Sequence, residues 1–335
     1  MTPRTPPNLF DEQHPTGAAR GIAWEDVACP LCGADHSEAR FEAADTTPAS
    51  LDPESLAGRK LRFLVVRCQT CGLHYTNPRP DPTAIGRFYP TDYKPHRNTN
   101  APARATKPRT HPLERLLGRP CHERRGQLPW PGTGRLLDFG CGGGSFLKRM
   151  ADLGWDVVGV DSAAGVVHRV RDELGLLAIE GSLPHVDLRP CSFEVVTMWH
   201  SLEHTHDPCA ILREAYRLLV PGGKLIVATP NIDSWSFRRF GPAWYGLDLP
   251  RHLTHFTPET LTVALQSAGL RVSNVRPLRH SRWLRSSARL AKGNLSWSGW
   301  SDRMLTWKAV AKVAAWLTYM FDQSDCMLAV AERPG

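Results

Sequence analysis

The chain has 335 residues, of which 41% are hydrophobic and 22% charged, enough for one full α/β domain and one small module. Its net charge of +8 leaves polyanionic partners open, whereas no apolar run near the C-terminus approaches the ~20 residues of a transmembrane helix. The N-terminus is rich in proline and threonine and has no apolar segment, so we expect no secretory signal and a cytoplasmic location. Residues 1–25 are expected to be disordered.

Four cysteines then form two pairs with the spacing of zinc knuckles. Cys29 and Cys32 make one C-x-x-C pair, Cys68 and Cys71 make the other, and a glycine follows each pair. Each pair can present two thiolates to one tetrahedral Zn²⁺ ion. The odd total of nine cysteines and the lack of a secretory signal argue against disulfides. We therefore predict a zinc-ribbon-like module over residues 26–93, with a structural zinc ion held by these four cysteines.

The next segment, residues 94–112, is rich in proline and basic residues, and is predicted to be a linker. Its charge allows two interpretations, a solvated hinge or a strip that binds phosphate or nucleic acid. Aromatic residues are absent between Tyr93 and Trp130, so stacking partners for bases are lacking and the hinge is favoured.

A glycine-rich loop begins the second half of the chain. Asp138 opens the sequence D-F-G-C-G-G-G, which lies between an apolar run at 135–137 and a helical pattern through Phe146, Leu147 and Met150. A strand, a glycine turn and a helix are the context of a nucleotide-cofactor loop. Glycines allow the backbone to approach the cofactor closely, and the Asp138 carboxylate suits a cofactor with a free ammonium group. The next apolar run, 157–160, ends in Asp161, whose carboxylate can accept both hydroxyls of a ribose.

Later segments continue the strand and helix alternation. An apolar strand at 192–199 runs into W-H-S-L-E-H at 199–204, and Asp207 with Pro208 opens a helix. P-G-G at 221–223 ends that helix and precedes a strand at 224–228, followed by T-P-N at 229–231. A last strand is expected at 326–332.

These motifs resemble those of class I S-adenosyl-L-methionine (SAM)-dependent methyltransferases. D-x-G-x-G-x-G matches their first motif, and "LEH…DP…L…PGG.L…TPN" together with residues 250–261 resembles the group that includes the ubiquinone O-methyltransferases. The resemblance covers about residues 130–335. It implies an α/β, Rossmann-like seven-stranded sheet of order 3-2-1-4-5-7-6, with an antiparallel last strand, over a domain at 113–335. It also implies SAM as the cofactor, with contacts from Asp138, Gly140, Gly142, Gly144, Asp161, Ser182, Leu183, Trp199 and His200.

The cysteine module also resembles a known one. Its second knuckle, followed by N-P-R-P at 77–80, is similar to the N-terminal module of some sugar C-methyltransferases. Those enzymes continue into a further C-terminal domain, whereas this sequence stops where the methyltransferase fold is expected to end. Sugar C-methylation is therefore an alternative rather than the first expectation.

Histidines follow the expected fourth and fifth strands, where the acceptor of the methyl group would lie. His204 or His200 can act as the base that removes a hydroxyl proton, with His252 and His255 in reserve. Alternatively, His200, Glu203 and His204, which have the spacing of one helical face, hold a divalent metal, because the ubiquinone O-methyltransferases carry a similar E-x-x-E-H. The third interpretation is structural: Glu203 and His204 cap the next helix.

Residues 234–255 are predicted to cover the acceptor. Aromatic side chains there offer flat apolar surface and arginines offer forks for phosphate or carboxylate. The candidates are Trp235, Arg238, Arg239, Trp244, Tyr245 and Arg251. The alternative is a partly helical segment that packs on the edge of the domain.

Near the C-terminus, apolar residues recur with helical spacing on one face. They are Trp307, Val310, Ala314, Leu317 and Phe321. Such a helix usually packs on a sheet; a lid over an apolar acceptor or contact with a membrane surface is the alternative.

The sequence thus predicts methyl transfer from SAM to a small molecule, at a hydroxyl of a sugar, polyketide-like or polyprenyl-type acceptor. The alternatives are an RNA methyltransferase or nucleic-acid-binding protein that uses the zinc module as a grip, and a SAM-binding protein without catalysis. The oligomeric state is left open.

Overall fold

A computed structural model describes residues 22–45, 61–89, 134–292 and 300–335. Residues 1–21 and the predicted linker at 94–112 lie outside these ranges. The centre of the protein is a seven-stranded sheet, in the order β12-β13-β10-β9-β6-β7-β8. The strands are β6 (Arg135–Phe139), β7 (Asp156–Asp161), β8 (Leu177–Glu180), β9 (Phe193–Trp199), β10 (Leu219–Pro230), β12 (Arg271–Leu278) and β13 (Cys326–Glu332).

Strand direction confirms the predicted topology. The pairs β8–β7, β7–β6, β6–β9 and β9–β10 are parallel, and β13 is antiparallel to both β10 and β12. Numbered from β6, the order across the sheet is 3-2-1-4-5-7-6, as the sequence predicted. The carboxyl ends of the parallel strands therefore meet at one edge, which the first residue of β13 also reaches.

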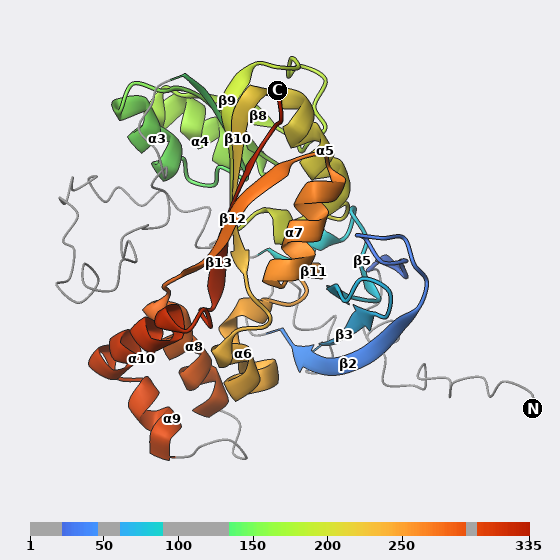
Figure 1. The fold of residues 1–335 in the computed structure, drawn as a ribbon, viewed down its shortest axis with the longest axis vertical. Helices are drawn as coiled ribbons and strands as arrows, with labels where there is room; N and C mark the ends of the chain where they lie inside the picture. The colour runs from blue at the N-terminus through green and yellow to red at the C-terminus, as the bar shows by residue number, and fades with distance from the viewer. Residues whose placement is uncertain (1–21, 46–60, 90–133, 293–299) are drawn as a thin grey trace, which may run out of the picture.

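Helices cover both faces of the sheet, with α3 and α4 on one side and α5 and α7 on the other (Figure 1). Neighbouring residues of a strand point to opposite faces: Leu136 belongs to the core cluster with Leu147 of α3, and Leu137 to the cluster with Leu212 of α5. These helices are α3 (Ser145–Asp152), α4 (Ala164–Leu174), α5 (Pro208–Leu218) and α7 (Pro258–Ser267).

Strand β10 starts earlier than the sequence predicted. Leu219 already pairs with Phe193 of β9, and the regular ladder resumes only at Lys224. The expected helix end, Pro221-Gly222-Gly223, therefore lies within an irregularity of the strand rather than before it.

A second group of helices lies beyond the carboxyl edge of the sheet (Figure 1). It comprises α6 (Trp235–Phe240), the 3₁₀ turns η5 (Gly241–Ala243) and η6 (Tyr245–Leu247), and α8 (Ser281–Lys292), α9 (Trp300–Leu305) and α10 (Lys308–Met320). The face predicted on α10 packs against these helices only in part. Val310 and Ala314 lie against the cluster around Leu284, while Leu317 and Phe321 are exposed. Within the described residues, no helix combines the length and the apolar character needed to cross a membrane.

The N-terminal module shares a sheet with the methyltransferase domain. Its strands are β1 (Trp24–Glu25), β2 (Ser37–Ala44), β3 (Arg62–Cys68), β4 (His74–Thr76) and β5 (Arg79–Pro80), with a 3₁₀ turn η2 (Ile85–Phe88). β1 pairs with β5, so ordered structure begins before residue 26. The order of the four-stranded sheet is β11-β4-β3-β2, and β11 (Thr254–His255) comes from the methyltransferase domain. Tyr75 of β4 also lies in the same core cluster as Phe256 and Leu261.

Candidate active site

The glycine loop connects β6 to α3 at the carboxyl edge of the sheet. Gly140 has a φ of +73°, and a Cβ atom there would lie 2.5 Å from the Cβ of Ser201. Only glycine fits this position, because the conformation is left-handed and the segment after β9 packs directly on the loop. Ser201 Oγ fixes that contact by donating to the carbonyl of Phe139 at 2.8 Å.

Two buried carboxylates flank the loop. Asp138, in β6, accepts a 2.6 Å hydrogen bond from Thr197 Oγ1, and Asp161, the last residue of β7, accepts from the amides of Gly142 and Ala163 at 2.9 and 3.0 Å. Both are at least 93% buried, at 2% and 7% exposure. A carboxylate has more acceptor sites than these contacts use, so both can also accept hydrogen bonds from a cofactor.

The remaining predicted cofactor residues lie at the ends of the neighbouring strands. Gly144 is the N-cap of α3 at φ +72°, without a side-chain cap on that helix. Ser182 and Leu183 follow β8, Leu183 being buried in the core. Trp199 ends β9 and packs edge-on against Phe146, with 5.3 Å between ring centroids. Its indole N–H is buried and has no hydrogen-bond partner among the described residues, which leaves a donor for a bound molecule.

Directly after β9 the chain makes a tight turn rather than a full helical turn. His200 has a φ of +56°, and the 3₁₀ turn η4 (Leu202–His204) follows. His200 Nδ1 lies 3.2 Å from Glu203 Oε1, so its N–H donates to that carboxylate and the lone pair lies on Nε2. Burial opposes ionisation of Glu203, but this hydrogen bond and the neighbouring histidines lower its pKa to about 2.

His204 points away from His200. Its Nδ1 lies 3.0 Å from the carbonyl oxygen of Arg251 and 2.9 Å from the hydroxyl of Tyr89. Its ring also packs edge-to-face on His252 at 4.6 Å. Burial lowers the pKa of His204 to about 4, so the ring is neutral at neutral pH. The two histidines therefore do not share one face, because the left-handed residue and the short 3₁₀ turn replace the helical turn that their spacing suggested.

The two later histidines are held by backbone and module contacts. His252 Nδ1 donates to the carbonyl of Gly246 at 2.9 Å. His255, in β11, lies 3.3 Å through Nε2 from the hydroxyl of Thr76, and burial holds its pKa well below the usual range. His255 thus lies in the four-stranded sheet, in register with His74 of β4.

A candidate metal cluster differs from the predicted set. Glu203, His204 and His252 bring one ligand atom each within 4.8 Å of one another. Glu203 Oε2 is buried and lacks a hydrogen-bond partner among the described residues. His200 belongs to a different cluster, because its ring packs against His280 and Trp283.

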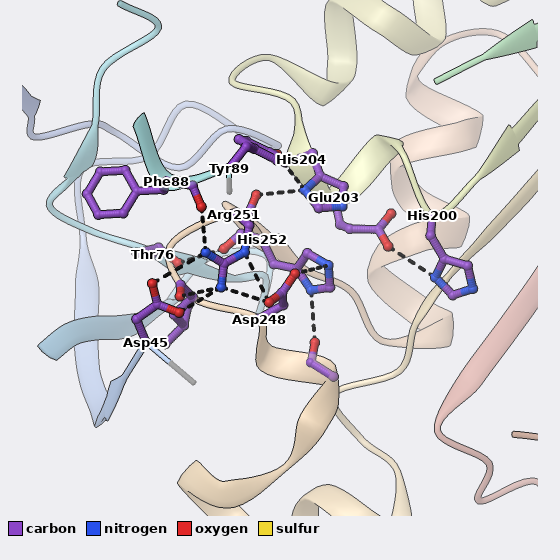
Figure 2. A network of polar contacts seen from close by, with 12 residues as sticks. Asp45, Thr76, Phe88, Tyr89, His200, Glu203, His204, Asp248, Arg251 and His252 are labelled. Carbon is purple, nitrogen blue, oxygen red and sulfur yellow. Dashed lines mark hydrogen bonds and ion pairs between the residues drawn. The ribbon is translucent and has the colours of Figure 1, made fainter. Parts of the chain in front are cut away.

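Arg251 is the centre of a buried polar network that joins the two parts of the protein (Figure 2). Its guanidinium is fully buried and donates to Asp45 Oδ1 at 2.7 Å, to Asp248 Oδ1 at 2.9 Å and to the carbonyl of Phe88 at 2.8 Å. Asp45 and Phe88 belong to the N-terminal module. Arg251 was predicted to bind an acceptor, but its donors are already used by these structural contacts.

The other predicted acceptor residues are spread over the α6 region. Trp244 is 1% exposed and donates through Nε1 to Asp325 at 2.7 Å, so it offers no free surface. Trp235 packs against Phe240. Arg238 is exposed and pairs with Asp233, and Arg239 lies over the ring of Phe240. Tyr245 is half-exposed and reaches the ring of Trp283 at 5.6 Å.

Several residues of this region were not predicted from the sequence. Tyr89 contacts His204, and Asp248 contacts Arg251. Trp283 and His280 both lie against His200. They come from the module, the η6 turn and the start of α8, so local spacing gave no signal for them. The sequence D-L-P-R at 248–251, with an aspartate three residues before an arginine, was the one local sign of an ion pair.

The cysteine pairs converge as predicted for a zinc site. Each knuckle has the same turn, with Gly33 and Gly72 at φ +73° and +78°. The four Sγ atoms lie within 4.8 Å of one another, with Cys29 to Cys71 at 3.5 Å and Cys32 to Cys68 at 3.6 Å. Sulfur atoms around a tetrahedral zinc lie about 3.8 Å apart, given Zn–S bonds of about 2.3 Å. The residues therefore fit a closed Zn–S₄ shell.

A seven-stranded sheet of order 3-2-1-4-5-7-6, with a glycine loop between two carboxylates at its carboxyl edge, defines a class I SAM-dependent methyltransferase. A family model described as a methyltransferase domain matches residues 103–275, which is more than half of the chain. The chain belongs to this methyltransferase family.

Curated relatives agree with the class. The ubiquinone biosynthesis O-methyltransferase of Xanthomonas euvesicatoria pv. vesicatoria is 35% identical over 174 residues, covering 47% of this chain and 70% of the relative. The enzyme of the same name from Xanthomonas axonopodis pv. citri is 34% identical over 178 residues, covering 48% of this chain and 72% of the relative. A Thermotoga maritima SAM-dependent methyltransferase is 21% identical over 61% of this chain and 84% of that chain, with a TM-score of 0.42.

Proposed function

We propose that this methyltransferase transfers the methyl group of SAM to a hydroxyl of a small-molecule acceptor. The main support for this proposal is the arrangement at the carboxyl edge of adjacent strands. Asp138 and Asp161 flank the glycine loop, and the Glu203–His200 pair follows the next strand, β9. The two carboxylates would receive the ammonium and ribose groups of SAM. The sulfonium methyl would then face the end of β9, where His200 lies.

His200 is the first candidate for the base. Its Nδ1–H donates to Glu203, which fixes the tautomer and favours the imidazolium that forms when Nε2 takes the proton of the acceptor hydroxyl. The hydroxyl oxygen then attacks the methyl carbon while the carbon–sulfur bond breaks. His204 remains an alternative, but burial lowers its pKa to about 4, which weakens it as a base. His252 and His255 are further alternatives.

The acceptor that we propose is a sugar, polyketide-like or polyprenyl-type hydroxyl compound. Support for an aromatic or polyprenyl acceptor comes from the names of the Xanthomonas relatives and from Trp283, whose ring lies 5.2 Å from that of His200 and 5.6 Å from that of Tyr245. Flat aromatic side chains favour a flat acceptor ring. The exposed Leu317 of α10 and Phe321, which follows this helix, would suit contact with a membrane surface that holds a polyprenyl acceptor. We place the enzyme in the cytoplasm.

We also propose one structural zinc ion bound by Cys29, Cys32, Cys68 and Cys71. A shell of four thiolates leaves no open position, so this ion would stabilise the module rather than take part in transfer. The module contacts the acceptor side of the domain through β11 and Arg251, and it would therefore act on transfer only through those contacts.

A screen of hydroxylated acceptors with methyl-labelled SAM tests this function. Transfer to a hydroxyl compound, reduced roughly 10²–10⁴-fold in His200→Ala with unchanged SAM affinity, is the expected result. Full activity in single alanine variants of all four histidines would mean that no histidine is the base. A salt-titrated RNA-binding assay addresses the alternative function: affinity that falls steeply with salt would favour a nucleic-acid substrate. SAM binding without transfer to any acceptor would favour a binding protein, and a product methylated at carbon would favour the sugar C-methyltransferase alternative.

A further inference from the structure

A second group of metal-ligating side chains meets at the carboxyl edge of the sheet. His200 follows β9, His280 lies between β12 and α8, and Cys326 is the first residue of β13. One ligand atom from each lies within 4.8 Å of the other two. We call this group the edge cluster.

The sheet topology explains why these distant residues meet. β13 lies between β10 and β12, and Cys326 is in register with Pro230 at the end of β10 and with Leu278 at the end of β12. Because β13 is antiparallel, its first residue lies at the edge where the parallel strands end. β9 pairs with β10 through Trp199, so His200 comes to the same edge.

His200 is oriented toward the edge cluster by Glu203. The Nδ1–H of His200 donates to Glu203 Oε1, and Figure 2 shows His200 at the outer end of the polar network, joined to it by this bond. In metalloproteins, a ligating histidine usually donates its second ring N–H to a carboxylate or a carbonyl, which fixes the ring and increases its basicity. Glu203 supplies that partner here.

The edge cluster is shielded from solvent at Cys326 and at the His200 side chain, while His280 is partly exposed. Cys326 is fully buried, and the side chain of His200 is 8% exposed. The ring of Trp283 lies 5.2 Å from His200 and 5.4 Å from His280. A thiol and two imidazoles converging in such a place have the ligand chemistry of a soft or borderline cation, because thiolate and imidazole select Zn²⁺ or Co²⁺ over Mg²⁺.

We propose that His200, His280 and Cys326 bind a thiophilic divalent cation, such as Zn²⁺, at the acceptor side of the site. Three protein ligands leave one position of a tetrahedral ion open, which is the arrangement of catalytic rather than structural zinc. The acceptor hydroxyl takes that position.

This proposal rests on the proposed function and gives His200 a different part in it. A hydroxyl bound to the cation loses its proton to water, because zinc lowers the pKa of a bound water to about 7. The resulting alkoxide forms a bond to the methyl carbon, and the carbon–sulfur bond breaks with its electron pair moving to sulfur. The products are the methyl ether and S-adenosylhomocysteine. If His200 acts as the base, the only residue that it requires beside it is Glu203. Binding of the cation requires His280 and Cys326 as well.

Cobalt binding to the full-length protein tests the proposal without any acceptor. The protein is supplied with one equivalent of Zn²⁺, which the four thiolates of the cysteine knuckles take up and which leaves the three-ligand edge cluster empty, and it is then titrated with Co²⁺. We expect Co²⁺ to bind with the near-ultraviolet charge-transfer band of a single thiolate. Cys326→Ser should abolish that band, and Glu203→Gln should weaken Co²⁺ binding roughly 10–100-fold. His280→Ala should weaken binding at least as much, and its partly exposed position makes loss of folding a minor risk.

Matched variants test whether Co²⁺ binds at other residues instead of the edge cluster. Cys191→Ser removes an exposed thiol elsewhere in the domain and should leave the cobalt spectrum unchanged. His252→Ala should also leave it unchanged. Absence of Co²⁺ binding in the wild type, or a band that survives both Cys326→Ser and His280→Ala, overturns the proposal. Cobalt binding lost in His252→Ala alone places the cation on Glu203, His204 and His252 instead.

SAM affinity, measured by calorimetry in the same variants, separates this proposal from the proposed function. Unchanged SAM binding together with methyl transfer in protein that binds no Co²⁺ would overturn the cation and leave the methyltransferase function in place. Failure of transfer to every hydroxyl acceptor, with Co²⁺ bound at Cys326, would overturn the proposed hydroxyl methylation and leave the cation site in place.

Discussion

Replacement of Arg251 by alanine should be the most destabilising single change at the contact between the module and the methyltransferase domain. The guanidinium is fully buried and joins Asp45 of the module to Asp248, the residue that follows the η6 turn. Both aspartates are largely buried, at 11% and 19% exposure of their side chains. Arg251→Ala would remove the guanidinium that offsets both charges in a place of low polarity.

The expected loss follows from that burial. Removal of one partner from a buried ion pair costs about 3–5 kcal/mol, because the remaining charge is uncompensated. With roughly 2–4 °C of melting temperature per kcal/mol in a domain of this size, we expect a decrease of about 6–20 °C. Thermal and urea unfolding, followed by circular dichroism, measure both quantities. The stability of Arg251→Lys should lie between those of the wild type and Arg251→Ala, because lysine keeps the charge but cannot bridge both carboxylates with a planar fork.

Arg238→Ala is the matched control. Arg238 lies on the same segment but is half-exposed and pairs with an exposed aspartate, so its loss should cost less than about 1 kcal/mol.

The pH dependence of the Arg251→Ala effect adds a second check. Arg251 outweighs the effect of burial and lowers the pKa of Asp248 to about 2. The stabilisation is therefore complete above the unfolded pKa of about 3.9 and disappears as the pH falls toward 2. An Arg251→Ala effect as small as that of Arg238→Ala, or one that does not shrink in acid, would refute the reasoning.

The remaining predictions concern the cofactor, the zinc site and the base. Asp138→Ala and Asp161→Ala should each weaken SAM binding by about 1.5–3 kcal/mol in calorimetry, and unchanged affinity in both would argue against the cofactor site. Elemental analysis should find one zinc ion fewer per chain in Cys71→Ser than in the wild type, with SAM affinity preserved; an unchanged zinc content would argue against the four-cysteine site. If His204 were the base, the rate would level off above its pKa of about 4, so a limb near neutral pH would point to another group.

Much of the fold could be predicted from local patterns. The glycine loop with Asp138 and Asp161, and the later run from L-E-H to T-P-N, matched a known family and so indicated the sheet order and the antiparallel last strand. The two C-x-x-C pairs predicted four converging thiols for the same reason. These signals are local, because a turn, a knuckle or a strand end is fixed by a few neighbouring residues.

The acceptor side depended on tertiary structure. The spacing of His200 and His204 suggested one helical face, but the left-handed conformation of His200 and a 3₁₀ turn send their rings to different neighbours. Arg251 and Trp244 had the composition of a ligand-binding loop, yet both are buried in contacts with residues far away in the sequence.

The class of enzyme, the cofactor loop and the cysteine site could be read from short segments with fixed spacing. Three other features arise from contacts between distant segments: β11 of the methyltransferase domain completes the module's sheet, Asp45 pairs with Arg251, and Cys326 and His280 meet His200. Such contacts follow from strand order and burial across the whole chain, and a local sequence pattern does not contain them.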